Sequence, residues 1–576
     1  MAWVSCQKEP VSATDPLPFP MDANKDLSVS PGDDFFAYCN GGWLKANPVA
    51  LERSFGGVLF GGETSIARRE KELRESDPYV ASFFRMLDQM HAHPEASEAF
   101  LEQKIAAIPK PASYEEAFRT VGRLLKEGVN TLAEIKISNV DGKVVLALLP
   151  ILSKDYSLHA RSGSQALDWI LDELGVAPEN VIMYSQLGPL FEALKGLSLD
   201  QLYAVMQEGQ RKMFQAYVRD EGLSEHARET VRREGRLLFN YPISYHLAQK
   251  YVPESKKQEW MGKVMEVKNA FRNRLLNADW LSETTRLYAV EKLDAMQCFV
   301  ATPDQWYLDC IPDIEPCSTF VEMAYLLQSA KNKISLKLVG GTDFFTRMML
   351  DSMQTANNEE VPADLTMCNA YYLPQANFYV IYPALLLPPI LSEDVSAARQ
   401  YALFCCVGHE ITHGFDNSGS KFDKYGNKHN WWTVADVMSF EDRCKALVNC
   451  YDHLVIDPDL YPDAYGNGTR TLGENIADLG GFLAALDAYK AYLERNGYFG
   501  EVYKAQLRRF YEGFADIWCV RYNQEKWNLL LNTDVHSPAR HRVNGVVMNT
   551  DLWYELYNVT RDNKLYLPPE RRSYIW

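Results

Sequence analysis

The sequence lacks an apolar run long enough to cross a membrane. A membrane-spanning helix needs about 20 consecutive apolar residues, whereas the longest candidates, 144–152 and 382–391, are shorter and contain proline. Basic residues are also in the minority, since 59 Lys and Arg face 76 Asp and Glu and leave a net charge of −17. Binding to nucleic acid or to an anionic membrane surface requires clustered basic residues. We therefore expect no transmembrane segment and no nucleic-acid partner.

Cysteine is sparse as well. The chain has 11 cysteines without a repeated short spacing, which excludes a disulfide-rich scaffold and a multi-cysteine zinc module. The first residues, MAWVSCQKEP, contain no basic region followed by an apolar stretch, so we expect no signal peptide and a cytoplasmic location for the chain as written. Cys6 keeps an alternative open. A small residue before a cysteine, followed by polar residues, is typical of a lipoprotein cleavage site, which would place the protein outside the cytoplasm.

Apolar residues are plentiful, at 47% against 23% charged, and indicate a globular protein with a sizeable core. Residues 1–32 are rich in proline, serine and aspartate and indicate an extended lead-in. After this lead-in, apolar residues recur at intervals of three and four, the pattern of helices that bury one face. The pattern predicts helices at 65–73, 115–127, 199–219, 255–277 and 282–296.

Other segments indicate strands. Residues 133–149 contain two β-prone stretches around Asp141-Gly142, a strong hairpin signal. Beyond about residue 325 aromatic residues and turns become more frequent, 377–382 indicates a strand, and 403–415 and 474–492 indicate helices. We predict a predominantly α-helical α+β fold, divided into a lead-in (1–32), a mostly helical lobe (33–325) and a further domain (326–576).

The motif that carries chemistry is CVGHEITHGF at 406–415. His409 and His413 are four residues apart, so on a helix they lie on one face and can bind the same metal ion. Two imidazoles suit Zn²⁺, and a catalytic zinc takes a third protein ligand and leaves one position to water. Glu410 would then be the general base toward this zinc-activated water.

Two histidines on one helix face can also be ordinary core residues, but a second segment supports the metal site. The stretch RTLGENIADLGG at 470–481 places Glu474 and Asp478 one helical turn apart. Glu474 is the natural third ligand, and Asp478 is the carboxylate that orients a zinc-binding histidine. Together the two segments predict one Zn²⁺ per chain.

The two motifs, in this order and spacing, resemble the neprilysin family of zinc metalloendopeptidases, which includes bacterial oligoendopeptidase O. The resemblance implies a thermolysin-like zincin catalytic lobe, of the gluzincin type, at 326–576. It also implies that 33–325 form a helical cap lobe that encloses a substrate chamber, with an N-terminal segment packed on the catalytic lobe. Similar segments elsewhere are PGDDFFAYCNGGWL (31–44), NAYY (369–372), YPALLLPP (382–389) and HSPARHRVNG (536–545).

The resemblance implies roles for further residues. His536 would donate to the oxyanion of the tetrahedral intermediate, and Asp534 would hold His536 charged. Arg542 would bind a substrate carbonyl on the leaving-group side, and Asn369 and Ala370 would bind the substrate main chain. An apolar pocket for the residue after the cut would be lined by Leu385, Ile390, Cys405, Cys406, Ile517 and Trp518.

Cys405 and Cys406 depart from the family's pattern, which has small aliphatic residues before the histidine motif. We interpret them as packed thiols, with a competing metal ligand or a redox switch as the alternative.

The function that follows is a zinc-dependent endopeptidase that acts as a monomer in peptide degradation. It would hydrolyse short peptides on the amino side of bulky hydrophobic residues. A zinc exopeptidase that trims peptide ends is one alternative. Another is a catalytically silent scaffold that binds peptides or acts at a cell surface.

Overall fold

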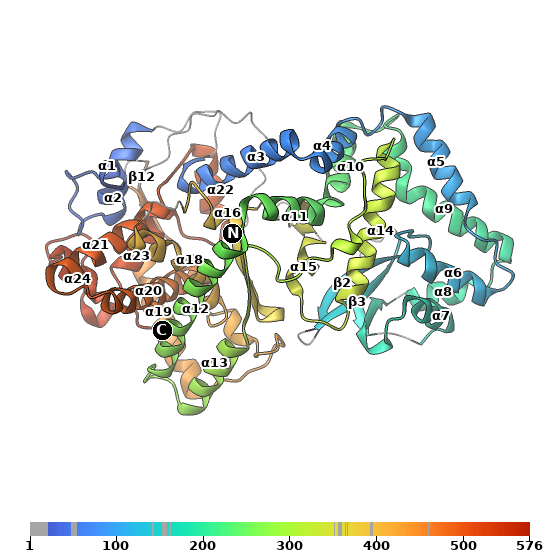
Figure 1. Ribbon diagram of the computed structural model, residues 1–576. Coiled ribbons are helices and arrows are strands. Elements are labelled where there is room, and N and C mark those ends of the chain that lie inside the picture. Colours follow the sequence, from blue (N-terminus) through green and yellow to red (C-terminus); the bar gives the residue numbers. More distant parts are fainter. Residues whose placement is uncertain are drawn as a thin grey trace. The chain divides into compact units, whose positions relative to one another are not determined.

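The chain forms a predominantly helical α+β fold, as the sequence predicts, in the computed structural model shown in Figure 1. The structure describes residues 21–47, 55–140, 143–151, 158–160, 163–185, 187–350, 352–354, 360–362, 365, 367–391, 396–458 and 460–576. Cys6 lies outside these residues. Within them, every helix is too short or too polar to cross a membrane.

Contacts divide the chain into two compact units. Unit 1 contains Met1–Arg68, Val252–Thr302 and Met367–Trp576, and unit 2 contains Arg69–Tyr251 and Pro303–Thr366. This division differs from the single boundary expected near residue 325. Helical periodicity shows that a segment buries one face, but it does not show which other segment covers that face.

Unit 2 is built from helices and two small sheets. Its larger sheet has the strand order β2-β3-β5-β4, and β7 pairs with β8. The helices are α4 (Pro78–Asp88), α5 (Pro94–Ala106), α6 (Tyr114–Lys126), α7 (Gln165–Leu174), α8 (Leu187–Leu194), α9 (Leu199–Val218), α10 (Glu225–Leu237), α11 (Asn240–Tyr251), α14 (Phe320–Leu338) and α15 (Phe344–Met349). The strands are β2 (Ala133–Val140), β3 (Lys143–Pro150), β4 (Leu158–Ala160), β5 (Val181–Tyr184), β7 (Ser352–Gln354) and β8 (Glu360–Pro362). Helix α3 (Val58–Ser76) begins in unit 1 and ends in unit 2.

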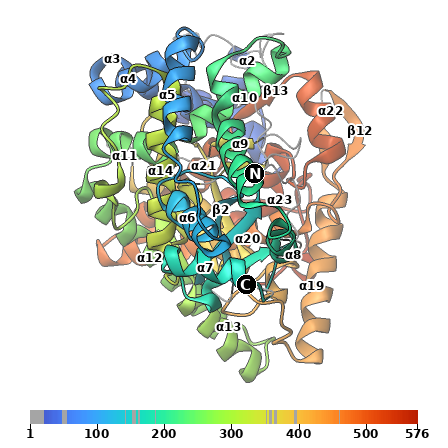
Figure 2. The ribbon, with the colours of Figure 1, turned by 90° about the vertical axis from the view of Figure 1, so that its right-hand side faces the viewer.

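The core of unit 2 is apolar. Helices α6 and α7 pack against each other, and α5 lies beside α9 (Figures 1 and 2). Leu146 and Leu148 of β3 are fully buried in one hydrophobic cluster with Phe118 and Val121 of α6 and Ile170 of α7. Burial of this apolar surface is what stabilises the unit.

Unit 1 contains the segments that carry the motifs. Its helices are α1 (Met21–Asn24), α2 (Phe35–Ala46), α12 (Glu254–Leu276), α13 (Glu283–Ala295), α16 (Pro383–Leu386), α17 (Ala397–Leu403), α18 (Cys405–His413), α19 (Val434–Asp452), α20 (Leu472–Arg495), α21 (Gly500–Ile517), α22 (Gln524–Thr533), α23 (Ala539–Val547) and α24 (Asp551–Tyr557). Its strands are β1 (Phe55–Gly57), β6 (Gln297–Val300), β9 (Ala370–Leu373), β10 (Phe378–Ile381), β11 (Val455–Asp457), β12 (Tyr461–Tyr465) and β13 (Val520–Tyr522).

A three-stranded sheet supports the motif helices. Its order is β6-β10-β9, with β10 parallel to β6 and antiparallel to β9. Strand β9 is therefore an edge strand among the strands that the structure describes. Helix α18 packs on β9 and on α20, and α12 packs on α20.

The helices predicted from periodicity are confirmed as α3, α6, α9, α12 and α13. The predicted hairpin is confirmed as β2 and β3, which pair antiparallel with Val140 opposite Lys143. Its expected turn, Asp141-Gly142, lies outside the described residues. The strand predicted at 377–382 is β10, and the helices predicted at 403–415 and 474–492 are α18 and α20.

The expected extended lead-in is interrupted by a short helix, α1, at Met21–Asn24. The Asp22 carboxylate pairs with Arg509 at 2.6 Å, and Lys25 pairs with Glu512 at 2.8 Å. Both partners belong to α21. Composition could not predict this helix, because ion pairs to a distant segment hold it in place.

Candidate active site

The two motif helices, α18 and α20, touch through glycines. A Cβ atom on Gly408 would lie 2.7 Å from the Cα atom of Gly481, and a Cβ atom on Gly481 would lie 2.3 Å from the backbone nitrogen of His409. Real Cβ atoms do not tolerate such distances, so both positions require glycine. This close approach brings the side chains of one helix within reach of those of the other.

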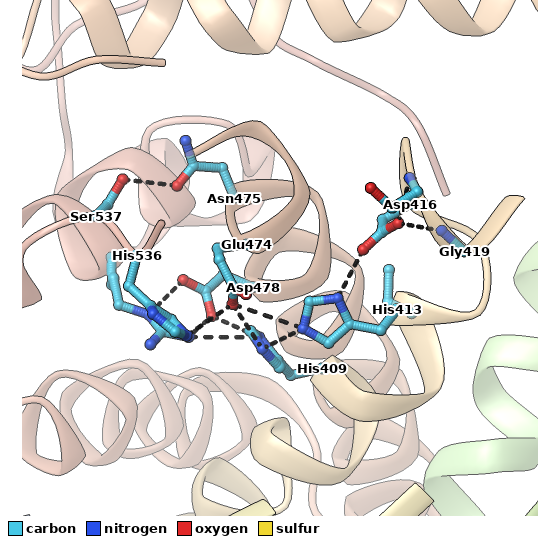
Figure 3. A network of polar contacts seen from close by, with 12 residues as sticks. His409, His413, Asp416, Gly419, Glu474, Asn475, Asp478, His536 and Ser537 are labelled. Carbon is cyan, nitrogen blue, oxygen red and sulfur yellow. Dashed lines mark hydrogen bonds and ion pairs between the residues drawn. The ribbon is translucent and has the colours of Figure 1, made fainter. Parts of the chain in front are cut away.

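His409, His413 and Glu474 meet at the contact of these helices, and Figure 3 shows them converging from α18 and α20. The Nε2 atoms of the two histidines are 2.9 Å apart. The Oε2 atom of Glu474 lies 3.2 Å from Nε2 of His409 and 3.6 Å from Nε2 of His413. One ligand atom from each residue lies within 4.8 Å of the other two. The three residues predicted as metal ligands are therefore together in space.

A carboxylate orients each histidine. Nδ1 of His409 is 2.8 Å from Oδ1 of Asp478, the contact that the sequence predicts. Nδ1 of His413 is 2.7 Å from Oδ2 of Asp416, a residue that sequence reasoning missed. With Nδ1 held on the outer side, Nε2 of each ring faces the shared centre (Figure 3).

The charges at this centre shift one another's pKa values. Burial opposes the charged form of His413, but the carboxylates of Glu474 and Asp416 raise its pKa well above the usual value. Burial likewise opposes the ionised form of Glu474, yet the neighbouring His536 and His413 hold its pKa well below the usual value. Glu474 is thus ionised, which is the form in which a carboxylate binds a metal ion.

A buried lysine holds the loop that follows α18. Lys292 on α13 is fully buried, and its Nζ donates to the carbonyl oxygens of Gly414 (2.7 Å), Gly419 (2.8 Å) and Phe422 (2.7 Å). Within this loop the backbone N–H of Gly419 donates to Oδ1 of Asp416 at 2.6 Å. Lys292 therefore stabilises the segment from which Asp416 reaches the histidine motif.

His536 lies on another side of the centre. Its Nε2 is 3.2 Å from Oε2 of Glu474, and its Nδ1 is 2.7 Å from Oδ1 of Asp534. The backbone N–H of His536 also donates to Asp534 at 2.9 Å. Burial opposes the ionisation of Asp534, but its bond with His536 lowers the pKa of the carboxyl. The structure thus pairs the two residues as the resemblance implies.

Arg542 binds the carboxylate that orients His409. Its Nε and Nη2 donate to the two oxygens of Asp478 at 2.7 and 2.6 Å. The guanidinium also lies over the ring of Trp518, 3.8 Å from the ring centroid. Burial opposes the ionisation of Asp478, but Arg542 lowers the pKa of this carboxyl. The contact of Arg542 with a substrate carbonyl stays a prediction. The sequence did not predict that Arg542 also pairs with Asp478.

His409, His413 and Glu474 together are called the metal-ligand group. A cavity of about 430 Å³ opens beside this group. Glu410 is buried and lines this cavity next to the histidines. The predicted substrate-binding residues that line it are Asn369, Ala370, Leu385, Cys405, Cys406, Ile517, Trp518 and Arg542.

Ile390 is not among the described residues that line this cavity, and its predicted contact with substrate stays a prediction. The side chain is fully buried, and the backbone N–H of Ile390 donates to the carbonyl of Leu387 at 3.1 Å. The sequence placed it close to Leu385, but the turn after α16 directs it into the core.

Cys405 and Cys406 are free thiols at the wall of the cavity. Burial raises the pKa of Cys406 to about 12, with a further contribution from Glu410, and raises that of Cys405 well above its usual value. Metal binding and redox exchange both use the thiolate. The packed-thiol interpretation is therefore favoured over a competing ligand or a redox switch.

Sequence reasoning also missed a polar network behind Glu474. The Oγ of Ser537 donates to Oδ1 of Asn475 at 2.8 Å (Figure 3). Nδ2 of Asn475 in turn donates to Oγ1 of Thr471 at 2.9 Å. Ser537 carries no local signal, since it lies 62 residues from Asn475 in the chain. Asp416 did have a local sequence signal, because it follows His413 by three residues and so lies on the same side of the turn.

Two sequence models of one family, described as peptidase family M13, match the chain over residues 203–303 and 369–573. Together they span just over half of its length and include the metal-ligand group, His536 and Arg542. The chain belongs to peptidase family M13. This is the neprilysin family that its motifs resemble.

Curated M13 relatives are about 30% identical to this chain over the matched part. The neutral endopeptidase of Lactococcus lactis subsp. lactis is 31% identical over 351 residues, which cover 59% of this chain and 50% of that protein. Human neprilysin is 28% identical over 319 residues, which cover 54% of this chain and 41% of that protein. The chain thus spans about half the length of the curated relatives that it matches.

Solved structures of M13 proteins share its fold. A cryo-EM structure of a zinc metalloprotease of Mycobacterium tuberculosis in the open state has a TM-score of 0.71 at 22% identity, covering 95% of this chain and 100% of that one. A crystal structure of PepO from Lactobacillus rhamnosis has a TM-score of 0.57 at 20% identity, covering 94% and 99%.

Proposed function

We propose that this protein is a zinc-dependent endopeptidase that hydrolyses short peptides. The observation that carries the proposal is the meeting of His409, His413 and Glu474 beside Glu410 at the wall of one cavity. Membership of peptidase family M13 supports it, as do relatives named neutral endopeptidase and neprilysin.

The donor set fits zinc. Two imidazole nitrogens and one carboxylate oxygen converge, and two histidines with one glutamate make a ligand set that leaves a position for water. Each Nδ1 is bound to a carboxylate, so the Nε2 atoms, 2.9 Å apart, face each other. A cation at this point satisfies both lone pairs together with the charge of Glu474. When bound, zinc would supply polarisation of the scissile carbonyl and a lowered pKa of the attacking water.

The chain's own residues then move the protons. Glu410 takes a proton from the attacking water and passes it to the leaving amine. His536, held by Asp534 at 2.7 Å, donates to the developing oxyanion, where a positioned donor is worth about 3 to 4 kcal/mol. Arg542 keeps Asp478 ionised and in place against the first histidine.

The cavity suits an extended peptide. Asn369 and Ala370 lie at the start of the edge strand β9, which can pair with a substrate backbone. Leu385, Ile517 and Trp518 line an apolar part of the same cavity. This part accommodates a bulky hydrophobic side chain on the residue that follows the cut.

The decisive experiment follows cleavage of a peptide of about ten residues that is blocked at both ends, with zinc content measured on every sample. Chelator removes activity and added zinc restores it. Glu410→Gln keeps its zinc but loses at least about 100-fold in turnover, because the general base is gone. Glu441→Gln, on an exposed position of α19, is the matched control and leaves turnover unchanged.

Three outcomes contradict the proposal. Full turnover by Glu410→Gln would show that Glu410 is not the general base. Stoichiometric zinc without cleavage across a varied peptide library would favour a binding scaffold. Cleavage of unblocked peptides only, at their ends, would make the protein an exopeptidase.

A further inference from the structure

The cavity has two chemically different ends. Near the start of α18 it is apolar, and α21 approaches α17 so closely there that a Cβ atom on Gly513 would lie 3.2 Å from Cβ of Ala402. Beyond the last turn of α18 the cavity is polar and is lined by Asn417 and Arg470. Helix α18 has nine residues, so at 1.5 Å per residue the ends lie about 13 Å apart. The metal-ligand group lies between them.

Arg470 brings an unpaired positive charge to the polar end. The side chain is half-buried and makes no ion pair with any residue that the structure describes. Its Nε is buried and, within the described chain, has no hydrogen-bond partner. A guanidinium left in this state against a cavity is a ready binding group for a carboxylate.

The carboxylates at this end do not neutralise Arg470, because both are engaged elsewhere. Asp416 accepts from His413 at 2.7 Å and from the backbone N–H groups of Ser418 and Gly419 at 2.7 and 2.6 Å. Glu474 faces the histidines of the metal centre. The positive charge therefore stays available to a ligand.

Asn417 adds an unmatched acceptor beside this charge. Its Oδ1 is buried without a hydrogen-bond partner among the described residues. The same oxygen lies 2.9 Å from the Cβ position of Gly473, at the start of α20. Buried polar atoms are almost always paired in folded proteins. A peptide N–H donated to Asn417 and a carboxylate on Arg470 would satisfy both residues at once.

The edge strand β9 sets the direction of a bound peptide. At one end the carbonyl of Asn369 accepts from the N–H of Tyr382 (3.1 Å), whose carbonyl accepts from Leu385 (3.2 Å). At the other end the Tyr372 hydroxyl lies 3.4 Å from the Cβ position of Gly414, just after α18. Antiparallel pairing is the more stable kind. It places the amino-terminal side of the peptide at the polar end and the carboxy-terminal side at the apolar end.

We propose that Arg470 is a subsite for an acidic side chain located among the three residues that precede the cut bond. An extended chain advances by about 3.3 to 3.6 Å per residue, so the distance between the two ends corresponds to about four residues. A bulky apolar residue after the cut and an acidic residue before it thus fill the two ends together. The inference rests on the proposed peptidase function and adds the charge of the substrate to it.

The test compares peptides, blocked at both ends, that carry Glu, Gln or Lys at each of the three positions before one fixed cleavage site. At one of these positions the wild-type protein prefers Glu over Gln by about tenfold or more in kcat/KM, the size expected of a hydrogen bond to a charged group. Arg470→Gln removes the preference between the Glu and Gln peptides. Arg470→Glu reverses it toward Lys, and Arg470→Lys retains part of it.

Arg495→Gln is the matched control, because Arg495 is an exposed arginine at the far end of α20, and it leaves the preference unchanged. If the wild type cleaves Glu and Gln peptides equally well, or if the preference survives in Arg470→Gln, the subsite inference is wrong but the peptidase proposal is unaffected.

Binding of the same peptides to Glu410→Gln is measured by fluorescence anisotropy. If the wild type cleaves none of the peptides but Glu peptides bind selectively through Arg470, the peptidase proposal fails and the subsite inference stands. If nothing is cleaved and binding is unselective, both fail.

Discussion

The two units bury different kinds of side chain. The core of unit 2 is an apolar cluster around β3, with Leu146 and Leu148 at its centre. In unit 1 the interior also holds charged groups. Among the described residues, every buried charged side chain other than Arg69 belongs to unit 1. They are Lys257, Lys292, Arg399, Glu410, Asp416, Asp423, Asp436, Asp478, Glu512, Asp516, Arg542 and Arg572.

This difference between the units shows that the charged groups of the candidate site lie in unit 1, and that their burial has a free-energy cost. Burying a charge is unfavourable unless it is paired or hydrogen-bonded. The proposed metal centre in unit 1 explains this cost, because it needs ionised carboxylates and oriented imidazoles away from bulk water. Stability in unit 1 should therefore depend on specific partners, and stability in unit 2 on apolar volume.

The largest effect is expected from breaking a buried ion pair of unit 1. Nε of Arg399 donates to Asp516 at 2.9 Å, and both side chains are almost fully buried. Arg399→Met leaves an unpaired carboxylate in the core and should cost about 3 to 5 kcal/mol. Hydrogen exchange measured by mass spectrometry should show the loss of protection in α17 and α21.

The double variant Arg399→Met with Asp516→Leu is the control for this pair. It removes both charges and should recover most of the loss. No recovery would mean that packing, rather than the unpaired charge, determines stability at this point of unit 1.

An apolar truncation in unit 2 should have a smaller and less specific effect. Leu148→Ala removes a fully buried side chain from β3 and should cost about 3 kcal/mol through lost burial and a cavity. Faster hydrogen exchange should be confined to β2, β3 and β5, and turnover per folded molecule should stay unchanged. A loss of zinc in this variant would contradict the separation of roles between the units.

A pH-dependent loss of stability is expected from a histidine of unit 1. Burial lowers the pKa of His541 to about 4, below its usual 6.5. Nε2 of His541 lies 2.7 Å from the carbonyl oxygen of Val455, and the buried Nδ1 has no partner among the described residues. Stability from this group is complete above pH 6.5 and is lost as the pH falls toward 4. The loss should be about 1.4 kcal/mol at pH 5.5.

Thermal unfolding of metal-free protein at pH 7.5 and 5.5 measures this effect without metal release. His541→Gln, which keeps a donor for Val455, should show a smaller drop between the two pH values than the wild type. An equal drop would assign the acid sensitivity to other groups.

The smallest effect is expected where charges are exposed. Arg119 in unit 2 pairs with Glu115 at 2.9 Å, on the surface of α6. Solvent screens such pairs, so Arg119→Ala should leave the melting temperature unchanged within error. A clear decrease would show that charge matters to unit 2 as it does to unit 1.

Local pattern was enough to predict much of this molecule. The spacing of His409 and His413 placed both on one helix face, and Glu474 was identified as their partner from a second helix. Periodicity also predicted helices such as α9 and α12, because one helix face recurs every three to four residues wherever the helix is packed. Sequence reasoning could not place residues whose surroundings depend on distant segments. Ile390 is buried in the core, and α1 is held by an ion pair with α21.

The sequence by itself thus identified the candidate metal-ligand set, the helices that carry it and the family, since these follow from residue type and short-range spacing. Only the tertiary structure decided which carboxylate meets which imidazole, that Lys292 holds the loop of Asp416, and that Arg470 lies unpaired at one end of the cavity. The physical reason is that contacts between distant segments depend on how closely helices pack. Here Gly408 and Gly481 allow α18 and α20 to approach each other, and no local pattern gives the resulting distances.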